Sequence, residues 1–241
     1  RSIASLSTLD SVLVVGSNLR KDHPLFAQRI RQAARKGAVV TAINAVQSDW
    51  AMPVAHAITV SAAEWLRTLA EVAQAVATAR GLAAPVATGA SSDTASAMAA
   101  ALLGGEHKAI LLGNAAAHHS QASQLLALAN WIGEHTGASV GYLTEAANTV
   151  GAQWVGAQPD ATGLHAGQML GGGLKGVLLF NTEPQFDSAA GEGAAAALGS
   201  ADMVVTLSPF KTNMAFSDVL LPIAPFTETS GTFVNAEGRA Q

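Results

Sequence analysis

The residues best placed to bind a ligand follow directly after short aliphatic runs. Gly16-Ser17-Asn18 comes after the run Val12–Val15 and before a predicted helix. Backbone N–H groups in such a strand-to-helix turn can bind a phosphate. The turn lacks the G-x-G-x-x-G pattern of dinucleotide-binding proteins, and Asn44 stands where an acidic residue would end the next strand. A nicotinamide or flavin site is therefore not expected, and a tight structural turn is the alternative interpretation.

Small polar residues also follow three later aliphatic runs, as Asn114, Asn181 and Ser208. In open parallel sheets, ligands bind outside the carboxyl ends of the strands. Polar residues also end strands and begin helices for purely structural reasons. Both interpretations of these positions stay open from the sequence.

Catalytic and metal-binding patterns are missing from the sequence. The chain has no cysteine, which removes thiolate metal sites, iron–sulfur ligation and any cysteine nucleophile. The G-x-S-x-G turn of serine hydrolases is absent. His118 and His119 are adjacent, so on a helix they point about 100° apart and do not share one metal ion. We assign no catalytic residue and no metal ligand.

Composition restricts the class of protein further. Of 241 residues, 49% are apolar and only 12% are charged, so the chain can build a core and is not disordered. Thirteen Lys and Arg against seventeen Asp and Glu give a net charge of −4, which excludes an electrostatic nucleic-acid surface. No apolar stretch reaches the roughly 18 residues that a membrane span needs. We expect neither a nucleic-acid partner nor direct membrane insertion.

Strand-sized apolar runs alternate with amphipathic helices, which predicts an α/β fold with mostly parallel sheets. The clearest βαβ unit comprises a strand over 12–15, a helix over 24–36 and a strand over 38–43. Gly81–Gly89 predicts a boundary between a partial Rossmann-like lobe, 1–84, and a second lobe, 85–241. In the second lobe we expect buried strands over 177–180, 203–207 and 218–221.

The C-terminal segment contains a distinctive series of Gly, Pro, polar and charged residues. The series is Asp218, Leu221, Pro222, Glu228, Gly231, Thr232, Asn235, Glu237, Gly238, Arg239 and Gln241. This series closely resembles the segment ADVxLPxxxxxExxGTxxNxEGRxQ of the molybdopterin oxidoreductase superfamily. Residues 13–30 are similar to its strand–GxNP–x₃-HP–helix unit, with Leu19 in place of the usual proline. Residues 148–151 and 156–159 resemble one branch, the large iron–sulfur subunit of the NADH:quinone oxidoreductase of respiratory complex I.

The resemblance implies two intertwined three-layer α/β/α lobes, in a chain truncated at both ends. It implies that Gly16, Ser17 and Asn18 form a vestigial cleft loop. It also marks a family tail motif, for which we expect a structural role: Glu228, Gly231, Thr232, Asn235, Glu237 and Arg239. For the Arg239 guanidinium, a solvated side chain and a pair with Glu228 or Glu237 both remain open.

Catalytic members of the superfamily carry a D-P-R-x-T-like string after the second strand, whereas residues 43–50 here lack it. The resemblance therefore favours a scaffold in the large iron–sulfur subunit of complex I, inactive alone, that supports electron transfer from NADH to quinone. It implies no cofactor in this piece, iron–sulfur clusters in a missing N-terminal part, and no molybdopterin. Implied partners are the peripheral-arm subunits of complex I, at the cytoplasmic face of the inner membrane. The alternatives are a piece of a catalytic, formate dehydrogenase-like molybdopterin enzyme and a nucleotide-binding α/β module of unrelated function.

Overall fold

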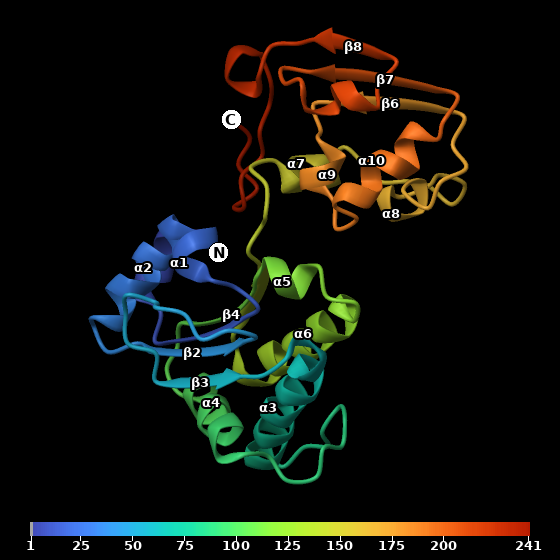
Figure 1. The fold of residues 1–241 in the computed structure, drawn as a ribbon. Coiled ribbons are helices and arrows are strands. Elements are labelled where there is room, and N and C mark those ends of the chain that lie inside the picture. Colours follow the sequence, from blue (N-terminus) through green and yellow to red (C-terminus); the bar gives the residue numbers. More distant parts are fainter. Residues whose placement is uncertain (1) are drawn as a thin grey trace. The chain divides into compact units, whose positions relative to one another are not determined.

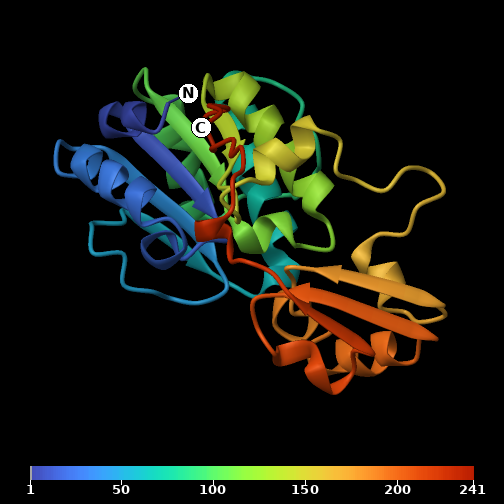
Figure 2. The same cartoon turned by 90° about the horizontal axis from the view of Figure 1, so that it is seen from above.

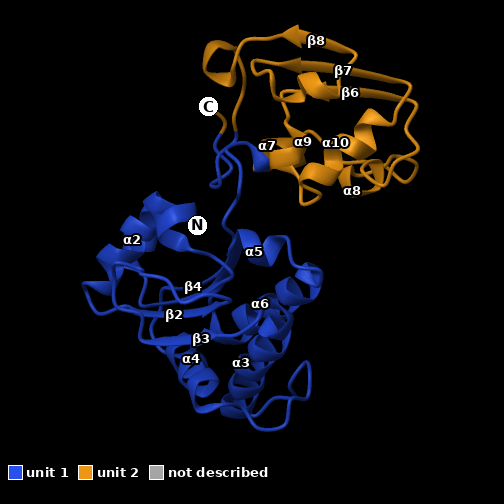
Figure 3. Cartoon of the chain, in the orientation of Figure 1, with its two compact units in different colours: residues 1–149, 234–239 blue, residues 150–233, 240–241 orange. Residues whose placement is uncertain are grey.

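The computed structural model describes residues 2–241, which form two compact units (Figure 3). Unit 1 comprises residues 1–149 and 234–239, and unit 2 comprises residues 150–233 and 240–241. The expected boundary at residue 84 lies inside unit 1, because strands on both sides of that position belong to one sheet. The α/β class with parallel sheets is confirmed.

Unit 1 contains a five-stranded parallel sheet in the order β3-β2-β1-β4-β5 (Figure 1). Its strands are β1 (Ser11–Val15), β2 (Val39–Asn44), β3 (His56–Thr59), β4 (Lys108–Leu112) and β5 (Ser139–Tyr142). The order reverses between β1 and β4. Ligands of open α/β sheets bind at such a switch point.

Helices cover both faces of this sheet. One face carries η1 (Ala4–Thr8), α1 (Leu19–Asp22) and α2 (Pro24–Ala34). The other face carries η2 (Ala62–Glu64), α3 (Trp65–Arg80), α4 (Asp93–Leu103), α5 (Asn114–Ala117) and α6 (Ala122–Thr136). Pro24 begins α2, where its missing N–H is not needed, and Gly81 ends α3 in the left-handed conformation.

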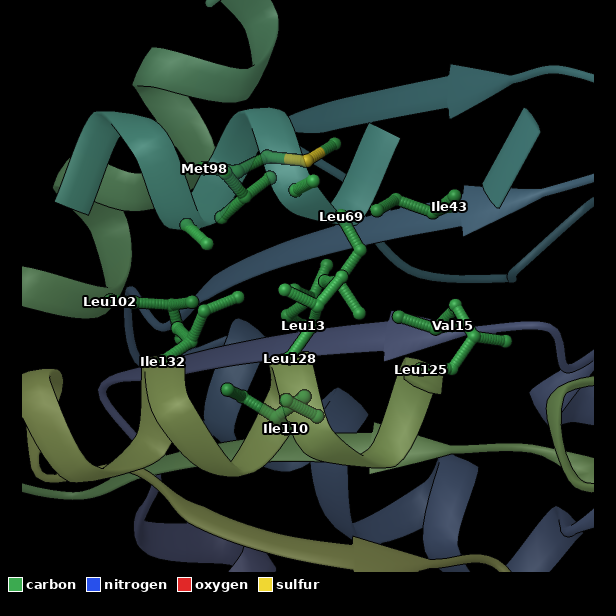
Figure 4. Close-up of a cluster of buried hydrophobic side chains, with 14 of the residues drawn as sticks. Leu13, Val15, Ile43, Leu69, Met98, Leu102, Ile110, Leu125, Leu128 and Ile132 are labelled. Carbon is green, nitrogen blue, oxygen red and sulfur yellow. The ribbon is translucent and has the colours of Figure 1, made fainter. Parts of the chain in front are cut away.

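The centre of unit 1 is β1, which packs against helices on both sides. Leu13 and Val15 face the cluster formed with α3, α4 and α6 (Figure 4), and Val12 and Val14 face the cluster formed with α2. Alternate residues of a strand point to opposite faces, so a strand buried on both faces is apolar at every position. Each such fully buried side chain contributes roughly 1.5–3 kcal/mol.

Unit 2 contains a three-stranded parallel sheet in the order β6-β7-β8. Its strands are β6 (Gly176–Phe180), β7 (Met203–Ser208) and β8 (Val219–Pro222). The helical elements are α7 (Thr149–Trp154), α8 (Ala166–Met169), α9 (Pro184–Asp187), α10 (Glu192–Gly199), η3 (Thr212–Ala215) and η4 (Phe226–Glu228). Both ribbon views show α9 and α10 on one side of the sheet, with its other side open (Figure 2).

Unit 2 therefore has two layers rather than the expected three, and the expectation of buried strands there is wrong for β6 and β8. Leu178 is 69% exposed, Phe180 is 67% exposed and Leu221 is 47% exposed. Only the helix-facing residues are buried, with Leu179 and Val204 packing in one small cluster with α10. An apolar run predicts that a strand has apolar faces but not that both are covered.

Candidate functional site

A pocket of unit 1 lies where β1, β2 and β4 end side by side. Val15 pairs with Ile43 on one side and with Leu112 on the other, so the residues that follow these strands meet at one edge. They enclose a cavity of about 240 Å³. Its lining comprises residues 16–18 and 22, residues 44–46 and 48, Trp65, Asn114 and Ala115.

The turn after β1 approaches α5 so closely that only glycine fits at two positions. Gly16 adopts a φ of +66°, which favours glycine. A Cβ atom added at Gly113 would lie 2.3 Å from the Ser17 Cβ and 2.5 Å from the Gly16 carbonyl oxygen. The backbone N–H of Ala115 donates to that carbonyl at 3.1 Å. The predicted loop of residues 16–18 is thus a tight turn packed against the start of α5.

The Asn44 side chain holds the turn from the β2 side. Its Oδ1 accepts from the backbone N–H of Ser17 at 2.9 Å, and its Nδ2 donates to the Ser17 carbonyl at 3.1 Å. Ser17 is only 3% exposed, so these two bonds satisfy backbone groups that water does not reach freely. The carboxamide of Asn44 therefore occupies the N–H group that a phosphate would need.

Asp22 closes the rest of the turn. Its Oδ2 accepts from the backbone N–H of Asn18 at 2.9 Å and from the Ser17 hydroxyl at 3.2 Å. The remaining N–H, that of Gly16, donates to the Ile43 carbonyl at 2.9 Å. Every backbone N–H of residues 16–18 thus has a partner within the protein.

The same closure occurs after the first strand of unit 2. The Asp187 Oδ2 accepts from the backbone N–H of Glu183 at 2.7 Å and from the Thr182 hydroxyl at 3.1 Å. As with Asp22, the carboxylate lies four residues after the N–H donor and five after the hydroxyl. The two units thus end their first strand with one and the same capped turn.

The charge of the unit 1 pocket also disfavours a phosphate. Among the described lining residues, Asp22 is the one carboxylate and there is no Lys, Arg or His. Phosphate sites normally offer free N–H groups or cationic side chains. The cavity is also smaller than the roughly 300–1,000 Å³ typical of small-molecule sites. The pocket is therefore poorly suited to an anionic ligand.

The two adjacent histidines lie in different surroundings and are not metal ligands together. His118 pairs with Glu145 at the surface, whereas His119 stacks on Trp65 with ring centroids 5.9 Å apart. The His119 Nε2 lies 2.9 Å from the Ala62 carbonyl, and its Nδ1 accepts from the Gln121 N–H at 3.0 Å. These contacts assign the proton to Nε2. Within residues 2–241, no group of three or more His, Asp or Glu side chains is arranged to hold a metal ion.

Part of the tail motif forms a turn that belongs to unit 1. The Asn235 Oδ1 accepts from the backbone N–H groups of Glu237 and Arg239, both at 3.0 Å. Gly238 adopts a φ of +78° in this turn. The turn is attached through Glu237, whose Oε1 accepts from the Ile3 N–H. In this geometry Asn235 and Glu237 hold the turn, and neither residue lines the pocket at the strand ends.

The other tail residues lie apart from this turn. Glu228, Gly231 and Thr232 belong to unit 2 and are exposed. Arg239 lies 3.8 Å from the Glu237 carboxylate, and its side chain is 70% exposed. Of the two expected partners, Glu237 is the one that Arg239 contacts. The contact is long and the Arg239 side chain is mostly exposed, so this side chain is largely solvated.

The sequence profile described as "Molybdopterin oxidoreductase" matches residues 1–241. The chain belongs to the molybdopterin oxidoreductase family. Among solved structures, it is similar to a chain of the formyltransferase/hydrolase complex (FhcABCD) from Methylorubrum extorquens, solved with methylofuran. The TM-score is 0.64 at 15% identity, over 99% of this chain and 69% of that chain. This second likeness concerns the fold alone. No curated protein sequence matches the chain.

The family name implies a molybdopterin, which carries phosphate. The turn of residues 16–18 does not fit such a group, because its N–H groups are occupied and the nearest charge is the Asp22 carboxylate. We therefore assign this pocket no part in molybdopterin chemistry.

Sequence reasoning misses the residues that close the pocket of this family member. From the sequence, Asn44 only takes the place of a missing acidic residue, and Asp22 is not among the predicted site residues. His23, 8% exposed, bonds through Nε2 to the Asn114 Oδ1 at 3.2 Å, a pair separated by 91 residues. The spacing of Ser17 and Asp22, repeated at Thr182 and Asp187, is the available signal for the closure.

Proposed function

We propose that this chain is a scaffold domain of an oxidoreductase of the molybdopterin family and holds no redox centre of its own. The observation that carries the proposal is the closed turn of residues 16–18. Its backbone N–H groups bond to Asn44, Asp22 and Ile43. A domain that binds a phosphate at this edge needs those groups free.

The energetics support the same conclusion. A phosphate bound at residues 17 and 18 would displace the Asn44 amide and the Asp22 carboxylate from their donors. It would also lie beside a like charge in a partly buried pocket, which weakens anion binding. In unit 2, the Asp187 carboxylate likewise occupies the Glu183 N–H and the Thr182 hydroxyl.

The identity of the assembly is a finer proposal with two candidates. The tail and the residues around 148–159 resemble the large iron–sulfur subunit of NADH:quinone oxidoreductase. A formate dehydrogenase-like molybdopterin enzyme is the other candidate, and the comparisons support it better, because the matching family is named for molybdopterin enzymes. The structural neighbour comes from a multi-subunit complex, which supports protein partners in either case.

The two candidates are separated by the activity of the native assembly that contains this chain. The assembly is isolated through an affinity tag on the chain, and two rates are measured: quinone reduction with NADH, and dye reduction with formate. Formate-dependent reduction supports the second candidate and NADH-dependent reduction the first. If an intact assembly shows neither of the two activities, both candidates are contradicted.

A further inference from the structure

A second cavity of unit 1 lies outside the pocket at the strand ends. It is a groove of about 900 Å³ between α3, α6 and the loop that connects α3 to α4. Hereafter it is called the α3–α6 groove, lined by Leu66, Arg67, Ala70, Pro85, Val86, Ala87, Thr88, Gln124, Ala127, Leu128 and Trp131. Its volume lies within the range of small-molecule sites, roughly 300–1,000 Å³.

The α6 wall of the groove is formed by four residues on one face of the helix. Gln124, Ala127, Leu128 and Trp131 are spaced three, four and seven residues apart, so they share one face of the helix. The Trp131 ring packs against His135, with centroids 4.3 Å apart. The groove is thus mostly apolar, with Gln124 at one end of the α6 wall and one large aromatic side chain, Trp131, at the other.

The loop wall is attached only at its ends. At one end, the Leu82 N–H donates to the Ala77 carbonyl at 2.9 Å. At the other, the Ser91 hydroxyl donates to the Glu71 carbonyl at 2.9 Å. Within the described chain, residues 83–90 make no hydrogen bond between these points, and the Thr88 Oγ1 is buried without a partner. No hydrogen bond to a described residue therefore fixes the middle of the loop in its present position.

Charge determines the class of occupant. Arg67 is the one charged residue among the described lining residues, and its side chain is 71% exposed at the groove. It makes a long contact of 3.5 Å with Glu71, whose other oxygen accepts from the Ser92 N–H at 3.3 Å. The guanidinium therefore keeps donors free for a further carboxylate. An apolar cleft with one cation is complementary to a ligand that has an apolar body and a carboxylate.

We propose that the α3–α6 groove binds a small amphipathic carboxylate, its apolar body against Trp131 and Leu128 and its carboxylate on Arg67. The loop of residues 83–90 packs over the apolar body of the bound ligand. This site is independent of the proposed scaffold function, because it uses no residue of the capped turn.

Decanoate is a suitable probe, and decanol and decyltrimethylammonium are its neutral and cationic matches. Each is titrated calorimetrically into the 241-residue protein below its micelle concentration. We expect saturable binding of one decanoate. Decanol should bind about five-fold more weakly or worse, as the loss of a partly exposed ion pair implies, and the cation more weakly still.

Two variants locate the site. Arg67→Gln should weaken the binding of decanoate about five-fold and leave the binding of decanol unchanged. The control is Arg80→Gln, at an exposed position on the same helix, which should change neither affinity. Ala127→Trp fills the groove and should abolish binding of both, while the exposed Ala196→Trp in unit 2 should not. Circular dichroism confirms that each variant is folded.

Several outcomes would overturn the proposal. These are no saturable binding of decanoate, equal affinity for decanol, or binding that survives in a folded Ala127→Trp protein. Unchanged decanoate affinity in Arg67→Gln, whose side chain is exposed enough to be replaced without loss of fold, would also overturn it.

Discussion

Replacing Asn44 with alanine removes both hydrogen bonds that hold the backbone of Ser17. Each such bond contributes about 1 kcal/mol net, and a buried donor left without a partner costs about 1–3 kcal/mol. Ser17 is 3% exposed, so water replaces the lost partners only in part. We therefore expect unit 1 of the Asn44→Ala variant to lose about 2–3 kcal/mol of stability.

The measurement is urea unfolding followed by tryptophan emission in a Trp154→Phe background. Trp50, Trp65 and Trp131 all belong to unit 1, and Trp154 is the single tryptophan of unit 2. Emission in this background reports the unfolding of unit 1 alone. The matched control is Asn130→Ala, an exposed asparagine on α6, which should stay within about 0.5 kcal/mol of the background protein.

A loss below about 0.5 kcal/mol in Asn44→Ala, equal to the control, would show that Asn44 does not stabilise the turn. The backbone of Ser17 would then not depend on Asn44, and its N–H would be available to a ligand. Asn44→Asp keeps the acceptor but turns a carboxylate oxygen toward the Ser17 carbonyl and adds a charge close to Asp22. Its loss of stability should therefore be at least as large as that of Asn44→Ala.

Three further substitutions test other parts of the structure. Asp10 accepts from the backbone N–H groups of residues 106 and 107, and these bonds lower its pKa. Its stabilisation is present above the ordinary pKa of about 4 and lost as pH falls through the lowered value, so Asp10→Asn should flatten the acid side of a stability–pH curve. Gly113→Ala should destabilise unit 1 by about 1–3 kcal/mol through overpacking, whereas Gly141→Ala, with no neighbour within 4 Å, should unfold at the parent urea midpoint. Arg239→Lys should change stability by less than about 0.5 kcal/mol, because its pair is exposed; a loss of several kcal/mol would show a buried pair instead.

The sequence predicts unit 1 well because its signals are local. The runs around Val12 and Ile110 are apolar at every position, and this pattern is typical of strands covered on both faces. Glycines after α3 and α6 mark helix ends, and both are left-handed in the structure. Asn18 and Asn114, which follow two of these runs, both line the pocket at the strand ends.

The predictions that are wrong depend on long-range packing, which local sequence patterns do not show. The Gly- and Pro-containing loop of residues 81–89 predicts a boundary, yet β4 pairs with β1 across that loop. Composition does not reveal such pairing. In unit 2, the pattern of β6 does not distinguish a covered face from an open one, so Phe180 is expected inside but lies outside. The closure by Asp22 depends on its side-chain rotamer, and the repeated spacing of Ser17 to Asp22 and of Thr182 to Asp187 is the one sequence signal for it.

We propose that this domain supports an oxidoreductase of the family without holding a redox centre. Molybdenum and pterin content per copy of the chain, measured on the native assembly after release of pterin under denaturing conditions, tests it most directly. The capped turns around Asp22 and Asp187 predict that this chain binds neither, so that any molybdenum and pterin in the assembly belong to another subunit of the family. One molybdenum and a matching amount of pterin for each copy, with no other family subunit in the assembly to bind them, would contradict the account.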